Sequence, residues 1–328
     1  RSDKPSSLVF VQALDEGDPQ QESEFRDEVF QLEFPYNGKP KSLLKTINRL
    51  SYIQWGNDET AIAHDNWWNS RNQKAYVFNP SDPAVEPRVI FDYNYQDRYK
   101  DPGSFVTERN EMGSYVLALK GNRSFLIGSG YTKEGQFPFL DQLDLLSLKK
   151  KRLYRSAYTD KLEYISDFDV KKNLLLVRIE SPAEYPNYYF RDLKKMSLKE
   201  ITTFENPFRS IQNAHKEVIR YKREDGLDLS GTLYLPLGYD MESKEKVPMI
   251  LWAYPREYKD KASAGQSTAN PNRFTAPNYG SPIYWVSKGY VVLDGAAFPI
   301  VGEGDEEPND SFRQQLVANG KAAIDAVD

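Results

Sequence analysis

The chain has 328 residues, of which 39% are hydrophobic and 13% aromatic, and this length predicts about two domains. The apolar content is ample for packed cores, which excludes a wholly disordered chain. A formal net charge of −5 leaves no surplus of lysine and arginine to neutralise phosphates, and the absence of cysteine excludes disulfides, thiolate metal sites and cysteine nucleophiles.

Residues 1–206 read as a series of short β-strands separated by turns. Apolar and β-branched runs alternate with clusters rich in Asn, Asp, Pro and Gly, such as 79–83 and 101–103. We expect strands at residues 8–14, 28–34, 52–55, 75–78, 89–93, 115–119, 124–127, 140–146, 152–157, 164–170, 173–179, 187–192 and 200–204.

A repeat is visible in this series. Similar segments around Tyr52, Tyr115 and Tyr164 each open a set of strands; the last two are 49 positions apart, and the 63 positions between the first two include a longer loop at 95–110. Roughly four strands per unit at this period is typical of β-propeller blades. Three and a half sets are too few to close a ring of about four blades, so we expect further blades before Arg1.

The pattern changes after about residue 206. Two β-rich runs flank Asp225-Gly226, which predicts a hairpin whose glycine has a positive φ. Residues 247–254 form an unbroken apolar run, which is typical of a strand covered on both faces, and residues 290–294 predict a second such strand. Apolar runs of this length are far shorter than the roughly 20 residues of a membrane-spanning helix.

Two helices are expected among these strands. Ser281 as N-cap and Gly289 as stop bracket the first, and residues 310–327 are amphipathic at helical spacing with Asp310 or Ser311 as cap. Strands alternating with helices after a strand-only region predict two domains of different class. We place them at residues 1–206 and 207–328.

Few residues support metal or cofactor chemistry. Gly302 and Gly304 lack the third glycine of a dinucleotide-binding loop, and the acidic run 303–310 lacks the alternating ligands of a calcium loop. His64 and His215 are the only histidines, which excludes a histidine-rich metal centre. We therefore expect no metal and no cofactor.

A complete serine triad is also absent. The nucleophile elbow G-x-S-x-G does not occur; residues 265–269 come nearest, but they end in alanine and lie in a polar segment around Ser267. An α/β-hydrolase triad runs serine, acid, histidine along the chain, and no histidine follows His215. As written, the chain has no general base to activate a serine.

A family resemblance begins at residues 226–239, which read GLDLSGTLYLPLGY. This segment resembles the entry to the peptidase domain of the prolyl oligopeptidase family, where D-G-x-x-L-x-G-x-L-Y-x-P precedes the first covered strand. Residues 248–254 resemble the next strand of that family, which ends in a tyrosine-containing turn. Residues 289–294 resemble the following strand, and residues 320–328 the helix that leads to the nucleophile strand.

The resemblance extends to one branch of the family. The turn at residues 253–257 reads AYPRE instead of the usual Y-G/A-G-P, and residues 302–305 depart from the usual G-R-G. The departure in the turn is similar to the glutamyl-peptidase, or dipeptidyl-aminopeptidase-like, branch of the family. The resemblance implies a partial β-propeller of all-β blades over residues 1–206, followed by the N-terminal part of an α/β-hydrolase domain over residues 207–328.

The resemblance also implies an activity, that of a serine peptidase that hydrolyses short peptides through an acyl-enzyme. In the family the turn tyrosine donates its hydroxyl to the oxyanion, and the matching position is Tyr254. Without the family, Tyr254 reads as the end of a strand in the core. The triad is expected beyond Asp328, so we expect this chain alone to be inactive.

Arg256 is the candidate substrate-binding residue. In the glutamyl branch a cation from the domain interface should pair with an acidic substrate side chain, and Arg256 follows Tyr254 closely. An exposed ion pair within the protein explains the presence of Arg256 equally well.

The expected partner is a peptide, with no nucleic acid and no membrane span. Two alternatives stay open, a non-catalytic propeller that binds peptides or glycans and an esterase-type α/β hydrolase. An exported or cell-envelope location is favoured by resemblance, and the oligomeric state is open.

Overall fold

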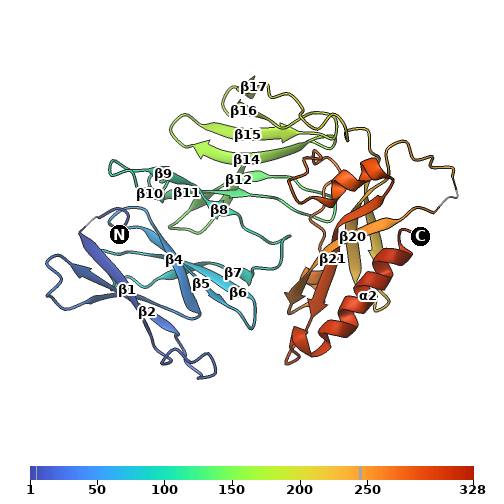
Figure 1. Cartoon of the computed structure of the whole chain (residues 1–328). Helices are drawn as coiled ribbons and strands as arrows, with labels where there is room; N and C mark the ends of the chain where they lie inside the picture. The colour runs from blue at the N-terminus through green and yellow to red at the C-terminus, as the bar shows by residue number, and fades with distance from the viewer. Residues whose placement is uncertain (5, 244–245) are drawn as a thin grey trace.

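The computed structural model describes residues 1–4, 6–243 and 246–328. Its first part is a series of small antiparallel sheets that follow one another in chain order from the lower left to the top of Figure 1. The first contains β1 (Ser7–Ala13), β2 (Asp27–Glu33) and β3 (Lys41–Thr46), and the second contains β4 (Arg49–Trp55), β5 (Ala61–Trp67), β6 (Asn72–Phe78) and β7 (Arg88–Asn94). The third contains β8 (Ser104–Phe105), β11 (Arg123–Gly128), β12 (Phe139–Asp144) and β13 (Lys150–Arg155), and the fourth β14 (Leu162–Asp169), β15 (Leu174–Glu180), β16 (Asn187–Asp192) and β17 (Ser197–Glu200). The predicted repeat of four-stranded units is confirmed in the second, third and fourth sheets.

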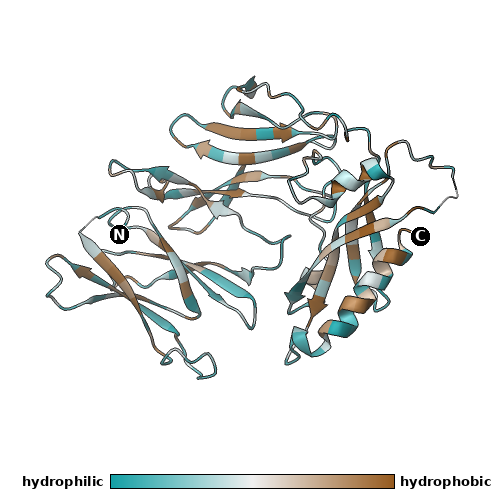
Figure 2. Cartoon of the chain, in the orientation of Figure 1, coloured by the Kyte–Doolittle hydropathy of each residue, from teal (hydrophilic) through white to brown (hydrophobic). Residues whose placement is uncertain are grey.

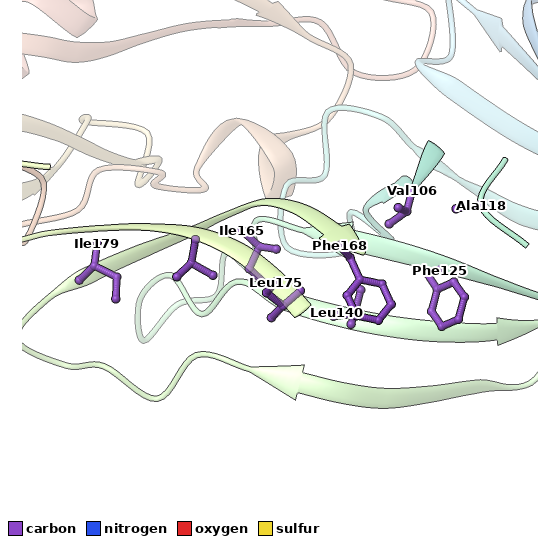
Figure 3. Close-up of a cluster of buried hydrophobic side chains, with 9 residues drawn as sticks. Val106, Ala118, Phe125, Leu140, Ile165, Phe168, Leu175 and Ile179 are labelled. Atoms are coloured by element: carbon purple, nitrogen blue, oxygen red, sulfur yellow. The ribbon is translucent and has the colours of Figure 1, made fainter. Parts of the chain in front are cut away.

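The cores of this part lie between successive sheets. One apolar cluster joins the first and second sheets through Val29 and Trp55, and another joins the second and third through Ile62 and Leu126. Figure 3 shows the cluster between the third and fourth sheets: Val106, Ala118, Phe125, Leu140, Ile165, Phe168, Leu175, Val177 and Ile179. Burying both faces of each sheet against its neighbours is how propeller blades form a core.

The third unit differs from its prediction. The expected loop at residues 95–110 contains β8 and also β9 (Thr107–Arg109), which pairs with β10 (Tyr115–Leu117). The strand beside β11 is therefore β8 and not the segment at Tyr115. Strands of two and three residues are too short to show a two-residue periodicity, so the sequence pattern did not reveal them.

Buried carboxylates link neighbouring strands of these sheets through hydrogen bonds. The Glu163 side chain on β14 is fully buried; it accepts hydrogen bonds from the Tyr154 hydroxyl at 2.6 Å and from the Arg191 guanidinium at 2.8 Å. Asp65 on β5, also fully buried, accepts from the Tyr76 hydroxyl at 2.8 Å. These donors compensate the burial of each charge.

The last part of the chain forms one mixed sheet, at the right of Figure 1. Its strands are β18 (Lys216–Lys222), β19 (Asp228–Tyr234), β20 (Met249–Tyr258) and β21 (Val291–Val301), in the spatial order β18-β19-β21-β20. The predicted hairpin of β18 and β19 is confirmed, with Gly226 at a φ of 84°. Strands β20 and β21 are parallel, whereas β19 pairs with its neighbours antiparallel.

Helices flank this sheet. They are α1 (Lys261–Ala264), the 3₁₀ helices η1 (Pro282–Lys288) and η2 (Pro308–Ser311), and α2 (Phe312–Asp325). The predicted bracketing of the first helix is confirmed, since Ser281 caps η1 and Gly289 ends it at a φ of 83°. Ser311 is the N-cap residue of α2, one of the two positions predicted, but its side chain makes no capping hydrogen bond. Instead the Ser311 hydroxyl accepts a hydrogen bond from the Gln315 amide, and a reciprocal pair of bonds between Glu307 and Asp310 closes the turn of η2.

One face of the mixed sheet packs against α2. Leu293 and Phe298 of β21 meet Leu316 and Ala323 of the helix in a shared core. Apolar and polar residues alternate along α2 in Figure 2, as expected for a helix with one buried face. No helix in the part of the chain that the structure describes is both long and apolar enough to cross a membrane.

Strand β20 contradicts the prediction of a strand covered on both faces. It begins at Met249, ends at Tyr258 and lies at the edge of the sheet, whereas its neighbour β21 is buried along most of its length. The helix α2 covers one face of the sheet, but Trp252 and Tyr254 on the other face of β20 are exposed. The apolar run therefore belongs to an edge strand with one open face.

Candidate active site

An exposed stripe on β20 carries both residues that the sequence singled out. Trp252, Tyr254 and Arg256 are all exposed, Trp252 to 54% and Tyr254 to 81%. Side chains two residues apart on a strand point to the same face. The three residues, which we call the β20 stripe, therefore share one face, and Ala253 on the opposite face packs in the core with residues of α2.

The carboxylate of Asp294 lies beside this stripe. The parallel register pairs Trp252 with Asp294 on β21, and an irregularity follows in which Ala253 pairs with Ala296, so that Gly295 has no partner on β20. Burial raises the pKa of Asp294, while a hydrogen bond from the backbone N–H of Gly295 opposes the shift. An acid thus stands next to the stripe at the point where β21 bulges.

The second small sheet holds the end of β20 in place. The Arg71 guanidinium lies 3.6 Å from the Glu257 carboxylate, and the Gln96 amide donates to the Glu257 carbonyl at 2.6 Å. The Asn94 amide donates to the Asp260 carboxylate at 2.8 Å. Tyr254 is three residues before Glu257, about 10 Å along the strand. These contacts fix the stripe relative to the strand-rich part of the chain.

A cavity of about 840 Å³ lies between the loop at residues 97–100 and the β18–β19 hairpin. Ser267 forms part of its wall, but Tyr254 does not. The Ser267 hydroxyl is 2.8 Å from the Ser230 hydroxyl, so its hydrogen bond is to a neutral partner. This serine is not activated by a base in this arrangement.

Both histidines lie apart from Ser267. His64 is buried on β5, stacks on Tyr52 with ring centroids 4.4 Å apart, and its Nε2 is 3.0 Å from the Gln54 side-chain oxygen. Burial lowers the pKa of His64 to about 4, so the ring is neutral. The exposed His215 has Glu217 at 3.6 Å. Within residues 1–4, 6–243 and 246–328, no hydrogen bond joins a histidine to a serine.

Tyr254 and Arg256 are brought to one face, but not in the turn that the sequence suggested. β20 continues through both residues to Tyr258, because β21 extends beside it as far as Val301 and supplies the parallel hydrogen-bonding partner. Tyr254 does not end a strand in the core either. Its side chain projects from the middle of an edge strand and is 81% exposed.

The sequence did not point to Lys216 and Arg273, which lie on the same side of the mixed sheet. The Lys216 ammonium donates a hydrogen bond to the backbone carbonyl of Arg273, and the two residues are 57 positions apart in the chain. No local motif links such residues. They meet only because the segment after α1 folds back against β18.

Metal ligands are not grouped in this structure. Among the described residues, no three or more His, Asp or Glu side chains are close enough to hold a metal ion. The arrangement around the β20 stripe offers instead a tyrosine hydroxyl, a guanidinium and a half-buried acid. The first two of these groups can donate hydrogen bonds to a bound oxygen.

Comparison with known proteins gives relatives for the whole chain. No family model matches it. Two curated plant proteins are 35% identical to it across 100% of its length, both called probable glutamyl endopeptidase, chloroplastic, one from Oryza sativa subsp. japonica and one from Arabidopsis thaliana. The chain covers 37% and 36% of these proteins, so it spans a little over a third of their length.

A solved structure shows the same fold. Oligopeptidase B from Trypanosoma brucei aligns with 98% of this chain and 44% of its own, at a TM-score of 0.51 and 16% identity. The small antiparallel sheets match the propeller domain of that enzyme. With the plant relatives, this confirms the resemblance to the prolyl oligopeptidase family and its glutamyl-peptidase branch that the motifs from Gly226 onward indicated.

Proposed function

We propose that the product of the gene encoding this chain is a serine peptidase of the prolyl oligopeptidase family that hydrolyses short peptides through an acyl-enzyme. Residues 207–328 are then the N-terminal part of its α/β-hydrolase domain. The parallel pair β20–β21, the helix α2 on one face and the 35% identity to glutamyl endopeptidases support this assignment. The triad is proposed for the remaining part of the gene product.

The exposure of Tyr254 carries the proposal. A tyrosine that donates to an oxyanion must present its hydroxyl to substrate, and Tyr254 is 81% exposed on a strand whose end is anchored. One such donor stabilises the transition state by roughly 3–4 kcal/mol. We assign this role to Tyr254, with a backbone N–H as second donor.

Arg256 is proposed to bind an acidic substrate side chain. The relatives are called glutamyl endopeptidases, and Arg256 shares the open face of β20 with Tyr254. Across the described ranges, no carboxylate oxygen lies within 4.0 Å of its guanidinium. An arginine without an acidic neighbour is available for a charge-assisted bond to a ligand carboxylate.

Residues 1–206 are proposed to form the propeller domain that limits access to the site. Its second sheet already contacts the end of β20 through Arg71, Asn94 and Gln96. A propeller domain this close to the β20 stripe would admit short or unfolded peptides to the site and exclude folded proteins.

The proposal is tested on the full-length gene product with matched peptides that contain glutamate or glutamine at one position, and with an ester of the same acyl group. We expect hydrolysis of the glutamyl peptide, with a KM that rises about tenfold or more in the Arg256→Gln variant. Arg209→Gln, an exposed arginine paired with Glu205, is the matched control. Turnover of the ester alone, or peptide binding without turnover, would contradict the proposal.

The chain of 328 residues is expected to be inactive by itself. Ser267 bonds to Ser230 and has no histidine partner, so a fluorophosphonate should not label it. Labelling at Ser267, found by mass spectrometry of the digested chain, would overturn this expectation.

A further inference from the structure

The chain contains the tripeptide Asn-Gly-Lys twice, in opposite structural settings. Asn37-Gly38-Lys39 lies in the loop between β2 and β3, whereas Asn319-Gly320-Lys321 lies inside α2. In an Asn-Gly pair the asparagine side chain is open to attack by the next backbone nitrogen, because glycine has no Cβ to obstruct the approach. The two copies therefore show what the fold does to the same local sequence.

The first copy is unconstrained. Asn37 and Gly38 are both exposed, and neither belongs to a strand or a helix. Among the residues that the structure describes, neither the Asn37 side-chain amide nor the Gly38 N–H has a hydrogen-bond partner. A Cβ added at Gly38 would meet no atom within 4 Å, so nothing packs against this glycine. The side-chain carbon of Asn37 and the nitrogen of Gly38 are therefore free to approach each other.

The second copy is held in place by the fold. Asn319 is fully buried; its amide donates to the Pro299 carbonyl at 2.9 Å, and its side-chain oxygen accepts from the Arg223 guanidinium at 3.0 Å. Gly320 lies within α2, where backbone N–H groups donate to carbonyls one turn earlier. Neither the side-chain carbon of Asn319 nor the nitrogen of Gly320 can react unless the helix opens locally, which costs free energy.

We propose that Asn37 is a site of spontaneous modification, at which the folded chain converts asparagine into isoaspartate and aspartate while Asn319 stays intact. The Gly38 nitrogen loses its proton to hydroxide and bonds to the side-chain carbonyl carbon of Asn37. That carbon then releases its amide nitrogen, which takes a proton from water, leaves as ammonia and regenerates the hydroxide. One water molecule opens the resulting five-membered succinimide. Opening at the main-chain carbonyl leaves isoaspartate, and opening at the side-chain carbonyl leaves aspartate.

The modification places a carboxylate in a mostly cationic part of the surface. Asn37 lines a cavity of about 450 Å³ whose charged side chains are Arg1, Lys4, Lys39, Lys41 and Glu33. The new negative charge is attracted by these cations, and isoaspartate lengthens the main chain of the loop by one carbon atom outside β2 and β3. An isoaspartate on this exposed loop is accessible to a carboxyl methyltransferase of the class that repairs isoaspartyl residues. The modification does not depend on the proposed peptidase activity.

The test is incubation of the folded 328-residue chain at pH 7.4 and 37 °C, with samples taken over several weeks. Cleavage after glutamate releases the two sites in separate peptides, residues 34–59 and 308–328, and mass spectrometry then measures the conversion at each asparagine. Methylation by a protein-isoaspartyl methyltransferase with a labelled methyl donor identifies the isoaspartate. We expect Asn37 to react at least about tenfold faster than Asn319, because α2 must open before Asn319 can react.

A variant and an unfolded sample assign the difference to its causes. Gly38→Ala places a Cβ in open space, so the loop is retained, but the Cβ obstructs the attacking nitrogen and should slow conversion of Asn37 about tenfold. Gly280→Ala, at another exposed glycine whose added Cβ meets no atom within 4 Å, is the matched control and should leave the rate unchanged. In urea, where α2 is unfolded, Asn37 and Asn319 should react at similar rates.

Equal rates at the two asparagines of the folded chain would overturn the inference, as would faster conversion at Asn319. An unchanged rate at Asn37 in Gly38→Ala would also overturn it, since the succinimide could then not be the route. A difference between the two sites that persists in urea would mean that the fold does not protect Asn319. None of these outcomes depends on peptide hydrolysis, so the inference and the proposed function fail or stand separately.

Discussion

The buried guanidinium of Arg71 lies 3.6 Å from the carboxylate of Glu257, and this contact joins the second small sheet to the strand that carries Tyr254. Arg71 is 1% exposed, stacks on the Trp68 ring at 3.7 Å, and approaches Glu257 from the turn between β5 and β6. The position of the β20 stripe thus depends on a side chain far from it in sequence.

Removing Arg71 should destabilise the chain more than removing its partner. Arg71→Met loses the buried ion pair and the stacking, and we expect the free energy of unfolding to fall by about 3 kcal/mol. Glu257→Gln leaves the Arg71 guanidinium stacked on Trp68 and bonded to the Trp68 carbonyl, and the Glu257 side chain is 31% exposed, so a smaller loss of about 1 kcal/mol is expected. Urea unfolding followed by tryptophan fluorescence measures both. Equal losses would contradict the anchoring role of Arg71.

The stability of the second sheet should depend on pH through His64. Its pKa is about 4 in the folded chain because of burial, whereas an unfolded histidine titrates near 6.5. Between these pH values the unfolded state binds more protons, so the free energy of unfolding rises from pH 4 to 6.5 and then levels off. The contribution reaches about 3 kcal/mol across this interval.

The variant His64→Phe removes this titration while keeping an aromatic ring on Tyr52. Its free energy of unfolding, measured in urea at pH 4.5, 5.5 and 7, should change less with pH than that of the parent chain. The exposed His215→Gln variant is the control and should keep the parental slope. Identical slopes in parent and His64→Phe would show that His64 is not the group responsible.

Glu163 should be among the most sensitive positions of the fourth sheet. Its side chain is fully buried and bonded to Arg191 and Tyr154, so Glu163→Gln leaves the half-buried Arg191 guanidinium without its carboxylate partner. We expect a loss of about 3–4 kcal/mol in the free energy of unfolding. Glu200→Gln, an exposed residue on β17, should change it by less than about 0.5 kcal/mol. A loss at Glu163 no larger than at Glu200 would contradict this reading.

Replacing Leu293 tests the packing of the core between the mixed sheet and α2. Leu293 is fully buried in the cluster that includes Phe298 and Ala323, and Leu293→Ala should lower the free energy of unfolding by about 3 kcal/mol. Val317→Ala on the exposed side of α2 should have little effect, since Val317 is 66% exposed. Chemical unfolding of both variants measures the difference, and comparable losses would mean that α2 does not pack on the sheet through the described face.

Much of the fold was predictable because its signals are local. The Asp225-Gly226 turn, the bracketing of η1 by Ser281 and Gly289, and the four-strand repeat each depend on neighbouring residues. Turn geometry and helix termination are decided within a few positions of the chain. These predictions are confirmed.

The position of β20 in its sheet was not predictable, because an apolar run reads the same at the centre and at the edge of a sheet. The exposure of Trp252 follows from the strand order, which local sequence does not encode. Lys216 and Arg273 were missed for a related reason, since tertiary structure alone brings them together. The family resemblance supplied Tyr254 and Arg256, which composition and periodicity did not.

The most direct test of the whole account is the effect of Tyr254→Phe on peptide hydrolysis by the full-length gene product. Tyr254 is exposed, so the variant should fold normally, and kcat should fall about 10²- to 10³-fold with little change in KM. Tyr279→Phe, which replaces a fully exposed tyrosine, is the matched control. An unchanged kcat in Tyr254→Phe would contradict the assignment of the mixed sheet to acyl transfer.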